Sequence, residues 1–532
     1  MAAPGALQEH PPLQGAARIW GTIALSSATF MNVLDSSIAN VSLPAIAGNL
    51  GVSPNQGIWV ITSFAVANAI SVPLTGWLSQ RFGQVRLFAA SLLLFVLASW
   101  LCGLAPSMPL LIAARALQGF VAGPMIPLSQ SLLLASYPRA LAGLAMALWA
   151  MSTLVAPVMG PLLGGWITDH FAWPWIFFIN VPVGFVAAFA VMALYRDRET
   201  RTRRVPIDSI GLALLVVWVG SLQMMLDLGK ELDWFESPLI TTLGVTALVG
   251  FAYFLVWELN EEHPVVDLRL FRIRNFWAGT AVTSLGYGVF FGNVVLLPLW
   301  LQQFMGYTAT DAGIVTAPVG LMALVLSPIV GRTIHKVDPR KYASFAFLTF
   351  ALVLWMRSWF NTQADLTTIL IPTLVQGVAM AFFFIPMMTL TMTGLTPAQM
   401  PSASGLNNFV RIIAGALGAS VFTTLWESRA AMHHAHLSEA VSAGNPVAQN
   451  TLQGLMSAGM SQQQALAQIN RLVDQQSFML AADDLFRISA WIFLGLIALV
   501  WLTRAPPRPL ADAGPRSGPG SSQGADASAG AR

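Results

Sequence analysis

Fourteen stretches of about 20 largely apolar residues follow one another along the chain. A helix of that length rises about 30 Å, which is the thickness of the hydrocarbon core of a bilayer. Only 10% of all residues are charged and 55% are hydrophobic, whereas soluble domains carry roughly 25% charge. The sequence therefore predicts an all-α membrane protein with fourteen transmembrane helices, at residues 19–43, 57–78, 87–105, 109–133, 141–165, 175–194, 208–228, 238–257, 277–301, 312–331, 342–360, 367–391, 404–425 and 486–503.

The loops between these stretches differ in their content of arginine and lysine. Fifteen bases follow the second, fourth, sixth, eighth and tenth stretches, whereas the short loops on the other side contain only Lys230 and Arg357. Loops that are rich in bases remain in the cytoplasm. Both termini are therefore predicted to be cytoplasmic.

Two charged segments, 195–206 and 258–276, divide the stretches into a 6+2+6 arrangement. Glycine and bases also occur together in 76–86 and 331–341, after the second stretch of each half. Parallel repeats of this kind are typical of secondary transporters, whose substrate binds between the halves. The predicted parts are a cytoplasmic N-terminal tail (1–18), an N-terminal six-helix bundle (19–194), a linker with two inserted helices (195–276), a C-terminal six-helix bundle (277–503) with an outside loop (426–485), and a disordered cytoplasmic tail (504–532).

Asp35 lies in the middle third of the first stretch. An ionisable residue inside a membrane span costs several kcal/mol, which makes it a candidate functional residue. A carboxyl group that alternates between apolar and cationic surroundings can take up a proton on one side and release it on the other. Arg115 in the fourth stretch is the expected partner, with Gln118 one turn away on the same helix face. The alternatives are a structural role for Asp35 and a snorkelling role for Arg115.

The fifth stretch contains a proline among glycines in APVMGPLLGGWI. Pro161 removes a backbone donor and is expected to kink the helix. Gly160, Gly164 and Gly165 permit close approach of a neighbouring helix. Such a helix could seal one face of the protein, although ordinary helix packing explains the pattern almost as well.

The second half contains no Asp or Glu within its first five stretches, away from their ends, but it does contain Arg411 beside two asparagines in SGLNNFVRIIAGALG. Met and aromatic residues crowd the twelfth stretch and form adaptable apolar surfaces, although most such residues are ordinary packing. The predicted substrate cavity combines side chains from both halves, namely Asn32, Gln118, Tyr287, Phe291, Asn293, Phe383, Met387, Asn407 and Arg411. Two embedded arginines against one carboxylate favour a lipophilic cargo that is neutral or weakly anionic.

Several other functions have no supporting pattern. The single cysteine, Cys102, excludes an intramolecular disulfide framework and a cysteine-based metal cluster. Three histidines at 433, 434 and 436 lack further ligands, so no metal site is predicted. No G-x-x-x-x-G-K-[ST] motif is present and the excess of bases is only three, so neither a nucleotide cofactor nor a nucleic acid partner is expected. An enzyme is expected to cluster titratable groups at one depth, whereas Asp35, Arg115 and Arg411 lie on three separate stretches, so no enzyme is predicted.

The end of the outside loop has a helical pattern. Ser461 and Gln464 have the spacing of a capping box, and apolar residues recur at helical spacing after them. An amphipathic helix outside the membrane is therefore predicted there.

Five motifs occur in order along the chain: LDSSIANVSLP in the first stretch, the loop GWLSQRFGQVR (76–86), RALQG in the fourth stretch, GPLLGGW in the fifth, and WPWIFFINVPVG before the sixth. With them the chain resembles the major facilitator superfamily over residues 19–503. More closely, it resembles the fourteen-helix drug:proton antiporters of the EmrB/QacA type. The segment DQQSFMLAADDLF (474–486) is similar to the EmrB side of this branch.

The resemblance implies export of lipophilic toxic compounds or drugs in exchange for protons, by alternating access, from a multi-pass position in the cell inner membrane. It also implies a periplasmic adaptor protein and an outer-membrane channel as partners. Asp35 and Arg115 occupy the proton-coupling positions of the family, and Gly160, Pro161, Gly164 and Gly165 match its antiporter motif. The gating loop is implied at Gly76, Arg81, Gly83 and Arg86.

Four positions depart from the family pattern. Gln80 stands where an acidic residue is usual in the gating loop, and Pro174 replaces the common arginine between two tryptophans. Ala147 and Ala156 stand where many members have glycine. Two other readings remain: uptake of a small nutrient or organic anion through the same fold, and a membrane enzyme or non-transporting receptor.

Overall fold

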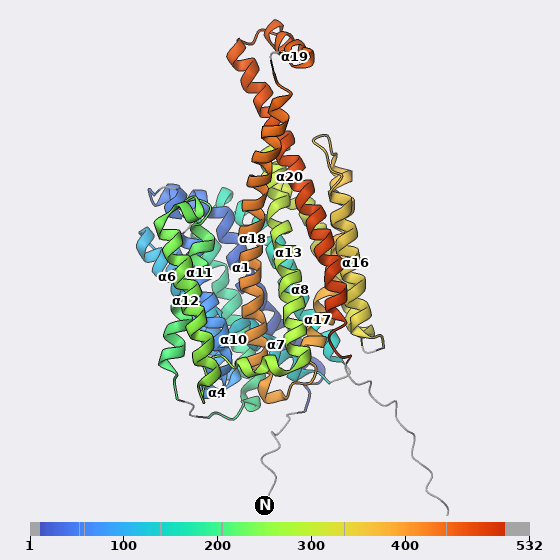
Figure 1. Ribbon diagram of the computed structural model, residues 1–532. Helices are drawn as coiled ribbons and strands as arrows, with labels where there is room; N and C mark the ends of the chain where they lie inside the picture. The colour runs from blue at the N-terminus through green and yellow to red at the C-terminus, as the bar shows by residue number, and fades with distance from the viewer. Residues whose placement is uncertain are drawn as a thin grey trace, which may run out of the picture.

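The computed structural model describes residues 11–505 except 53, 58, 139–140, 204–205, 335 and 443. The secondary structure of this part consists of helices, and each of the fourteen predicted stretches corresponds to a helix or a run of consecutive helices (Figure 1). Ten of these, among the described residues, are long and apolar enough to cross a membrane. The predicted disordered tail lies outside the described residues from 506 onward.

The N-terminal bundle is formed by helices of the first 198 residues. They are α1 (Gly15–Asn49), α2 (Pro54–Gly57), α3 (Trp59–Ser71), η1 (Val72–Leu74), α4 (Thr75–Phe82), α5 (Gln84–Gly103), α6 (Met108–Ala122), α7 (Met125–Ser136), α8 (Ala142–His170), α9 (Trp175–Phe178), α10 (Asn180–Tyr195) and η3 (Arg196–Arg198). Two of the expected spans are divided next to a proline, at Pro73 and Pro124, because proline has no amide hydrogen for the helix ladder.

The inserted pair consists of α11 (Ser209–Leu228) and α12 (Pro238–Asn260), with η4 (Trp234–Glu236) between them and η5 (Leu268–Arg272) after them. Helix α11 packs against α3 of the N-terminal bundle and against α18 of the C-terminal bundle. The pair therefore lies along the outside of the seam between the two bundles.

The C-terminal bundle repeats the pattern of the first. It contains α13 (Arg274–Phe304), α14 (Ala309–Thr316), α15 (Pro318–Thr333), α16 (Pro339–Arg357), α17 (Leu366–Thr391), η6 (Pro397–Gln399), α18 (Met400–Glu439), α19 (Pro446–Ser457) and α20 (Gln462–Val500). A proline again divides a span, where Pro318 separates α14 from α15.

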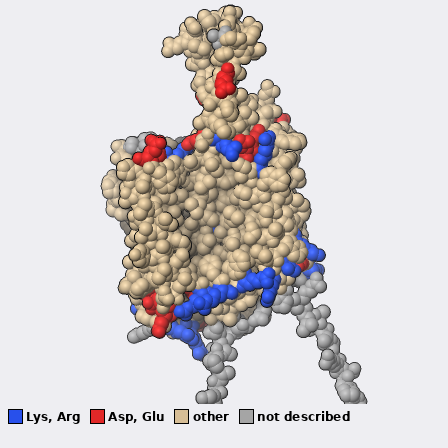
Figure 2. Space-filling model, viewed as in Figure 1, with Lys and Arg blue, Asp and Glu red and all other residues tan. Residues whose placement is uncertain are grey.

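Both ends of the described chain lie at the same end of the molecule (Figure 1). The backbone amide of Leu13 donates to the carbonyl of Ser136 at 3.0 Å, and the side chain of Asn275 donates to the carbonyl of Arg504 at 2.8 Å. We call this end the terminal face, and the opposite end the stalk face. In the view of Figure 2, charged side chains gather at these two faces and an uncharged belt separates them.

The segment predicted as an outside loop, residues 426–485, is helical over most of its length. Helix α18 continues to Glu439, α19 follows, and α20 begins at Gln462, so this segment is a helical projection that we call the stalk (residues 426–485; Figure 1). A search by hydropathy ends a span where polar residues begin, although the helix can continue beyond that point. The capping box is confirmed, since Ser461 and Gln464 bond reciprocally.

The base of the stalk is held by contacts between α18 and α20. Asp484 accepts hydrogen bonds from Arg429 at 3.2 Å and pairs with His433 at 2.9 Å. The indole of Trp426 donates to the carbonyl of Phe478 at 2.9 Å. Within the described residues, no group of three histidine, cysteine or acidic side chains could hold a metal ion.

The two bundles meet through their terminal-face halves. Helix α18 packs against η1, α4 and α7, and α8 packs along α15. At the second contact the backbones touch, because a Cβ atom on Gly143 would lie 2.5 Å from the carbonyl oxygen of Gly331. No side chain larger than hydrogen fits there without a shift of the helices.

Replacement of Gly143 by alanine therefore tests this seam. We expect G143A to lower the free energy of unfolding by about 1–3 kcal/mol, the usual cost of overpacking. The matched control is G165A on the same helix, where a Cβ meets nothing within 4 Å. This control should be neutral or stabilising by up to about 1 kcal/mol.

Cys102 is fully buried and is the single cysteine of the chain, so its reaction with a maleimide dye during heating reports unfolding. Equal melting temperatures for G143A and G165A would contradict the close contact.

Candidate functional site

A buried ion pair lies inside the N-terminal bundle. Asp35 on α1 has no exposed surface and Arg115 on α6 is 1% exposed. The guanidinium Nη1 donates directly to Asp35 Oδ2. The structure thus brings together the two residues that the sequence predicts as partners.

Two amides complete the surroundings of the Asp35 carboxylate. Gln118 donates to Oδ1 at 3.0 Å, and Asn180 at the start of α10 donates to the same oxygen at 2.8 Å. Gln118 also accepts from Arg115 at 2.8 Å and donates to Ser99 at 2.6 Å. The carboxylate therefore accepts from three donors on two other helices, which compensates for its removal from water.

Aromatic rings cover the cationic side of the pair. The Arg115 guanidinium carbon lies 4.3 Å from the ring centroid of Phe64 and 5.5 Å from that of Phe177. Its Nε donates to the carbonyl of Val60 at 3.0 Å. In this conformation the pair is shielded within one bundle, so access of a proton to Asp35 requires a conformational change.

Asn180 and Ser99 were not predicted as functional residues. Asn180 lies in the quoted motif WPWIFFINVPVG, where it is the first residue of α10. A polar amide at the start of a helix, within an otherwise apolar motif, could have indicated a functional residue. Ser99 carries no such signal, since a serine in an apolar helix usually bonds within its own helix.

The glycine motif of α8 packs against α1, next to the ion pair. A Cβ on Gly160 would lie 3.1 Å from the backbone carbon of Ser37, and one on Gly164 would lie 2.9 Å from Ile38. Gly165 has open space around it. The side chain of Pro161 lies outside the described residues. The two contacting glycines thus set the spacing of α1 and α8 within the N-terminal bundle.

The predicted gating loop lies at the terminal face between α4 and α5. Gly76 packs against Ser402 of α18, with a Cβ position 2.9 Å from the Ser402 Cα, so it belongs to the seam between bundles. Gly83 has a φ of +87°, a conformation that favours glycine. Arg81 lies over the Trp77 ring at 5.5 Å.

A carboxylate that the sequence did not single out occupies the start of α5. Glu199 accepts from the backbone amides of Val85 at 3.1 Å and Arg86 at 2.8 Å. Its oxygen also lies 3.9 Å from Arg86 Nε. A helix N-terminus stabilises a negative charge, so Glu199 fastens the linker after α10 to this loop.

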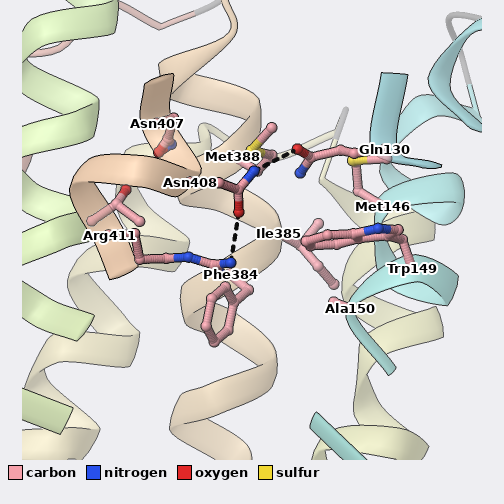
Figure 3. A pocket seen from close by; sticks show the side chains of 11 residues that line it. Gln130, Met146, Trp149, Ala150, Phe384, Ile385, Met388, Asn407, Asn408 and Arg411 are labelled. Atoms are coloured by element: carbon pink, nitrogen blue, oxygen red, sulfur yellow. Dashed lines mark hydrogen bonds between the residues drawn. The ribbon is translucent and has the colours of Figure 1, made fainter. Parts of the chain in front are cut away.

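A small pocket lies between the two bundles, in their terminal-face halves (Figure 3). The N-terminal bundle contributes Gln130, Met146, Trp149 and Ala150, and the C-terminal bundle contributes Thr283, Phe384, Ile385, Met388, Asn407, Asn408 and Arg411. The enclosed volume is about 20 Å³, which is room for about one water molecule. A drug-sized molecule fits here only after the bundles move apart.

Arg411 is the cation of this pocket. It donates to Asn408 Oδ1 at 2.6 Å, and its guanidinium lies 5.1 Å from the Tyr287 ring and 5.7 Å from the Phe384 ring. Within the described residues, no carboxylate lies within salt-bridge distance of it. Asn407 Oδ1 and Thr283 Oγ1 are buried and have no hydrogen-bond partner among these residues. The pocket thus offers a free positive charge and unused polar atoms among apolar walls.

Part of the residues predicted for the substrate cavity lie at this pocket. Asn407 and Arg411 line the pocket, Tyr287 stacks on the Arg411 guanidinium, and Phe291 stacks on Tyr287 at 5.7 Å.

The remaining predicted cavity residues lie inside the bundles. Phe383 and Met387 are buried in the C-terminal bundle, because their neighbours Phe384 and Met388, about 100° further around α17, face the pocket. Asn293 bonds to Ser489 at 3.0 Å, and Asn32 bonds to the carbonyl of Ala122 at 3.1 Å. Gln118 belongs to the Asp35 cluster. Residue type alone could not give the direction in which each side chain points.

The C-terminal bundle contains a cation that was predicted to lie in an outside loop. Arg357 is 2% exposed at the end of α16 and donates to Gln376 at 2.5 Å and Thr373 at 3.3 Å. The sequence predicts only Arg115 and Arg411 as embedded arginines, and this count is wrong because Arg357 is also buried. The pair Gln376-Gly377 on α17 corresponds to the pair Gln118-Gly119 on α6. Gly119 packs against α3 and Gly377 packs against α15, an earlier helix of the same bundle in each case. The second bundle thus has a related polar core, centred on a different arginine.

Comparisons with known proteins agree with this architecture. The family model described as Major Facilitator Superfamily matches residues 25–419. The chain belongs to the major facilitator superfamily. It is 51% identical to the multidrug export protein EmrB of Escherichia coli (strain K12) over 501 residues, which cover 94% of this chain and 98% of that protein.

A second relative is the fatty acid resistance protein FarB of Neisseria gonorrhoeae. It is 50% identical over 498 residues, which cover 94% of this chain and 98% of FarB. Among solved structures, the human organic anion transporter MFSD10 superposes with a TM-score of 0.57 at 13% identity, covering 92% of this chain and 100% of that chain. The chain is thus an EmrB-like member of the superfamily, and the structural likeness supports the fold.

The buried ion pair predicts a specific pattern of stabilities. R115Q leaves the Asp35 carboxylate without its cation and should destabilise the protein by about 3–5 kcal/mol. The double variant D35N/R115Q removes both charges and should recover most of that loss, because two neutral amides can bond to each other. Thermal unfolding of the wild type, D35N, R115Q and D35N/R115Q, followed by circular dichroism, measures the three losses of free energy.

Simple addition of the two single-variant losses in D35N/R115Q would contradict a direct, buried pair.

Proposed function

We propose that this protein exports lipophilic small molecules across a membrane in exchange for protons, by alternating access of one central site to the two sides. The observation that carries the proposal is a fully buried, protonatable carboxylate in one bundle together with a closed pocket, lined by both bundles, that separation of the bundles would enlarge. The relatives named multidrug export protein and fatty acid resistance protein support the transport of small toxic molecules.

Asp35 is proposed as the proton-carrying group and Arg115 as its counter-charge. When Asp35 is ionised, Arg115, Gln118 and Asn180 all donate to it. Protonation removes the charge that holds these donors, so the cluster rearranges and α1 is freed to move against α6 and α10. Each charge that moves down a potential of 100 mV yields about 2.3 kcal/mol to drive export.

The pocket around Arg411 is proposed as the central site. Its rings and methionines suit lipophilic cargo. The Arg411 guanidinium, which has no carboxylate partner among the described residues, favours neutral or weakly anionic molecules over dications. Alternating access is needed because the pocket is closed at the terminal face by the seam of Gly76, Gly143 and Gly331. Export requires this seam to open for loading and to close for release.

We further propose that all fourteen helical segments span the membrane, with both termini in the cytoplasm and the protein in the inner membrane. The basic terminal face is then cytoplasmic and the stalk projects outside. Helix α19 has no buried residue, and Val447 on it is 73% exposed. The stalk is the surface proposed to meet a periplasmic adaptor, which would connect to an outer-membrane channel.

An assay with everted membrane vesicles tests the proposal. Vesicles energised by respiration should accumulate a lipophilic acid, and an uncoupler should abolish the accumulation. D35N should reduce it by at least ten-fold, because no proton can be exchanged at that position. The matched control D197N changes an exposed carboxylate at the terminal face and should retain wild-type transport.

Uncoupler-sensitive accumulation by D35N at the wild-type rate would exclude Asp35 as the proton-carrying group.

A further inference from the structure

The Arg411 guanidinium is connected to the contact between the two bundles by a chain of hydrogen bonds. Arg411 Nη2 donates to Asn408 Oδ1 at 2.6 Å, and Asn408 Nδ2 faces Gln130 Oε1 at 3.4 Å (Figure 3). Ser404 Oγ donates to the same Gln130 oxygen. Gln130 belongs to α7 in the N-terminal bundle, and the other three residues belong to α18 in the C-terminal bundle.

Arg411 determines how the Asn408 amide is oriented. Because its guanidinium occupies the amide oxygen, the Asn408 nitrogen is turned towards Gln130 and towards the Ser404 carbonyl, which it reaches at 2.9 Å. Gln130 is 2% exposed and Asn408 is 5% exposed, so water cannot readily replace these bonds. Two donors on α18, Asn408 and Ser404, reach Gln130 of the other bundle, and Arg411 orients the first of them.

A negatively charged ligand would compete for the same guanidinium. A carboxylate in the pocket is a stronger acceptor for Arg411 than the neutral amide oxygen of Asn408. The pocket also holds unpartnered polar atoms, Asn407 Oδ1 and Thr283 Oγ1, beside the apolar rings. An aromatic or aliphatic acid fits this combination of one cation, free polar atoms and apolar walls.

We propose that Arg411 is an affinity switch that binds either the acid group of a lipophilic carboxylate or Asn408, but not both. This proposal rests on the proposed function and adds the substrate group, the residue that recognises it and the step that releases it. When the terminal face closes, Asn408 and Gln130 come together and Arg411 returns to Asn408. The cargo then loses its ionic partner while the opposite side is open.

The thermodynamic consequence is reciprocal. If closure weakens the binding of an acid, binding of the acid must favour the state that is open at the terminal face by the same factor. A neutral amide of the same shape also needs the open state, but it is a weaker acceptor for the guanidinium, as the Asn408 amide is, and should shift this equilibrium less than the acid does. The switch therefore distinguishes ligands by charge rather than by size.

Binding to the purified full-length protein in nanodiscs tests the switch, with 2-naphthoate as the acid and 2-naphthamide as its neutral isostere. N408A removes the competitor for Arg411 and should bind 2-naphthoate about ten-fold more tightly than the wild type, within the range of a charge-assisted hydrogen bond. Its affinity for 2-naphthamide should increase much less, because loss of the Asn408–Gln130 contact favours the open state equally for both ligands. R411Q should lose most affinity for the acid and retain that for the amide.

A second measurement uses spin labels on cysteines at Gln80 and Lys336, which are exposed at the terminal face on opposite bundles. The same concentration of 2-naphthoate should lengthen the distance between the labels more in the wild type than in R411Q. Equal effects of N408A on both ligands, a weaker binding of the acid by N408A, or equal distance changes with both ligands would overturn the switch. Loss of proton coupling in vesicles with these binding results intact would instead count against the proposed function alone.

Discussion

The ion pair of Asp35 and Arg115 governs the arrangement of the N-terminal bundle. A charged side chain deep in a membrane protein is costly unless it is paired and its remaining hydrogen-bonding capacity is used. Here α6 supplies the cation and one amide, α10 supplies a second amide, and α5 supplies Ser99 behind them. The glycines of α8 bring that helix against α1 on the other side. Helices from the whole first bundle thus depend on the charge state of one carboxylate.

The second bundle has the same helical plan, but among the described residues no carboxylate pairs with its buried arginine, Arg357. Arg357 bonds to Gln376 and Thr373, which are neutral at all relevant pH values, and Asn293 bonds to Ser489. A protonatable centre in one bundle and a fixed cation, Arg411, at the seam give the two halves different tasks. Asp35 and Arg411 belong to different clusters, so proton and cargo are best coupled through the relative position of the bundles rather than through direct competition for one site.

The sequence was sufficient where a single physical requirement dominates. Twenty apolar residues in a row require a helix, and an acid among them requires a partner, so the helices and the Asp35–Arg115 pair could be predicted. It was insufficient where the direction of a side chain decides. Phe383 and Phe384 are both aromatic, yet only Phe384 faces the pocket. Arg357 lies near the end of the apolar stretch 342–360 and is counted with the loop after it, because hydropathy does not show that α17 provides acceptors for it. Of the stalk, the sequence predicts the helix that begins after Ser461, but not the continuation of α18 to Glu439 beyond its apolar part.

Release of protons by the purified protein on addition of cargo tests the central claim most directly. In weakly buffered detergent solution with a pH-indicator dye, a neutral cargo such as 2-naphthamide contributes no proton of its own. The account predicts proton release on binding to the wild type, and none on binding of the same ligand to D35N. An equal proton signal from D35N, with cargo bound, would show that the exchanged proton resides elsewhere and would contradict the account.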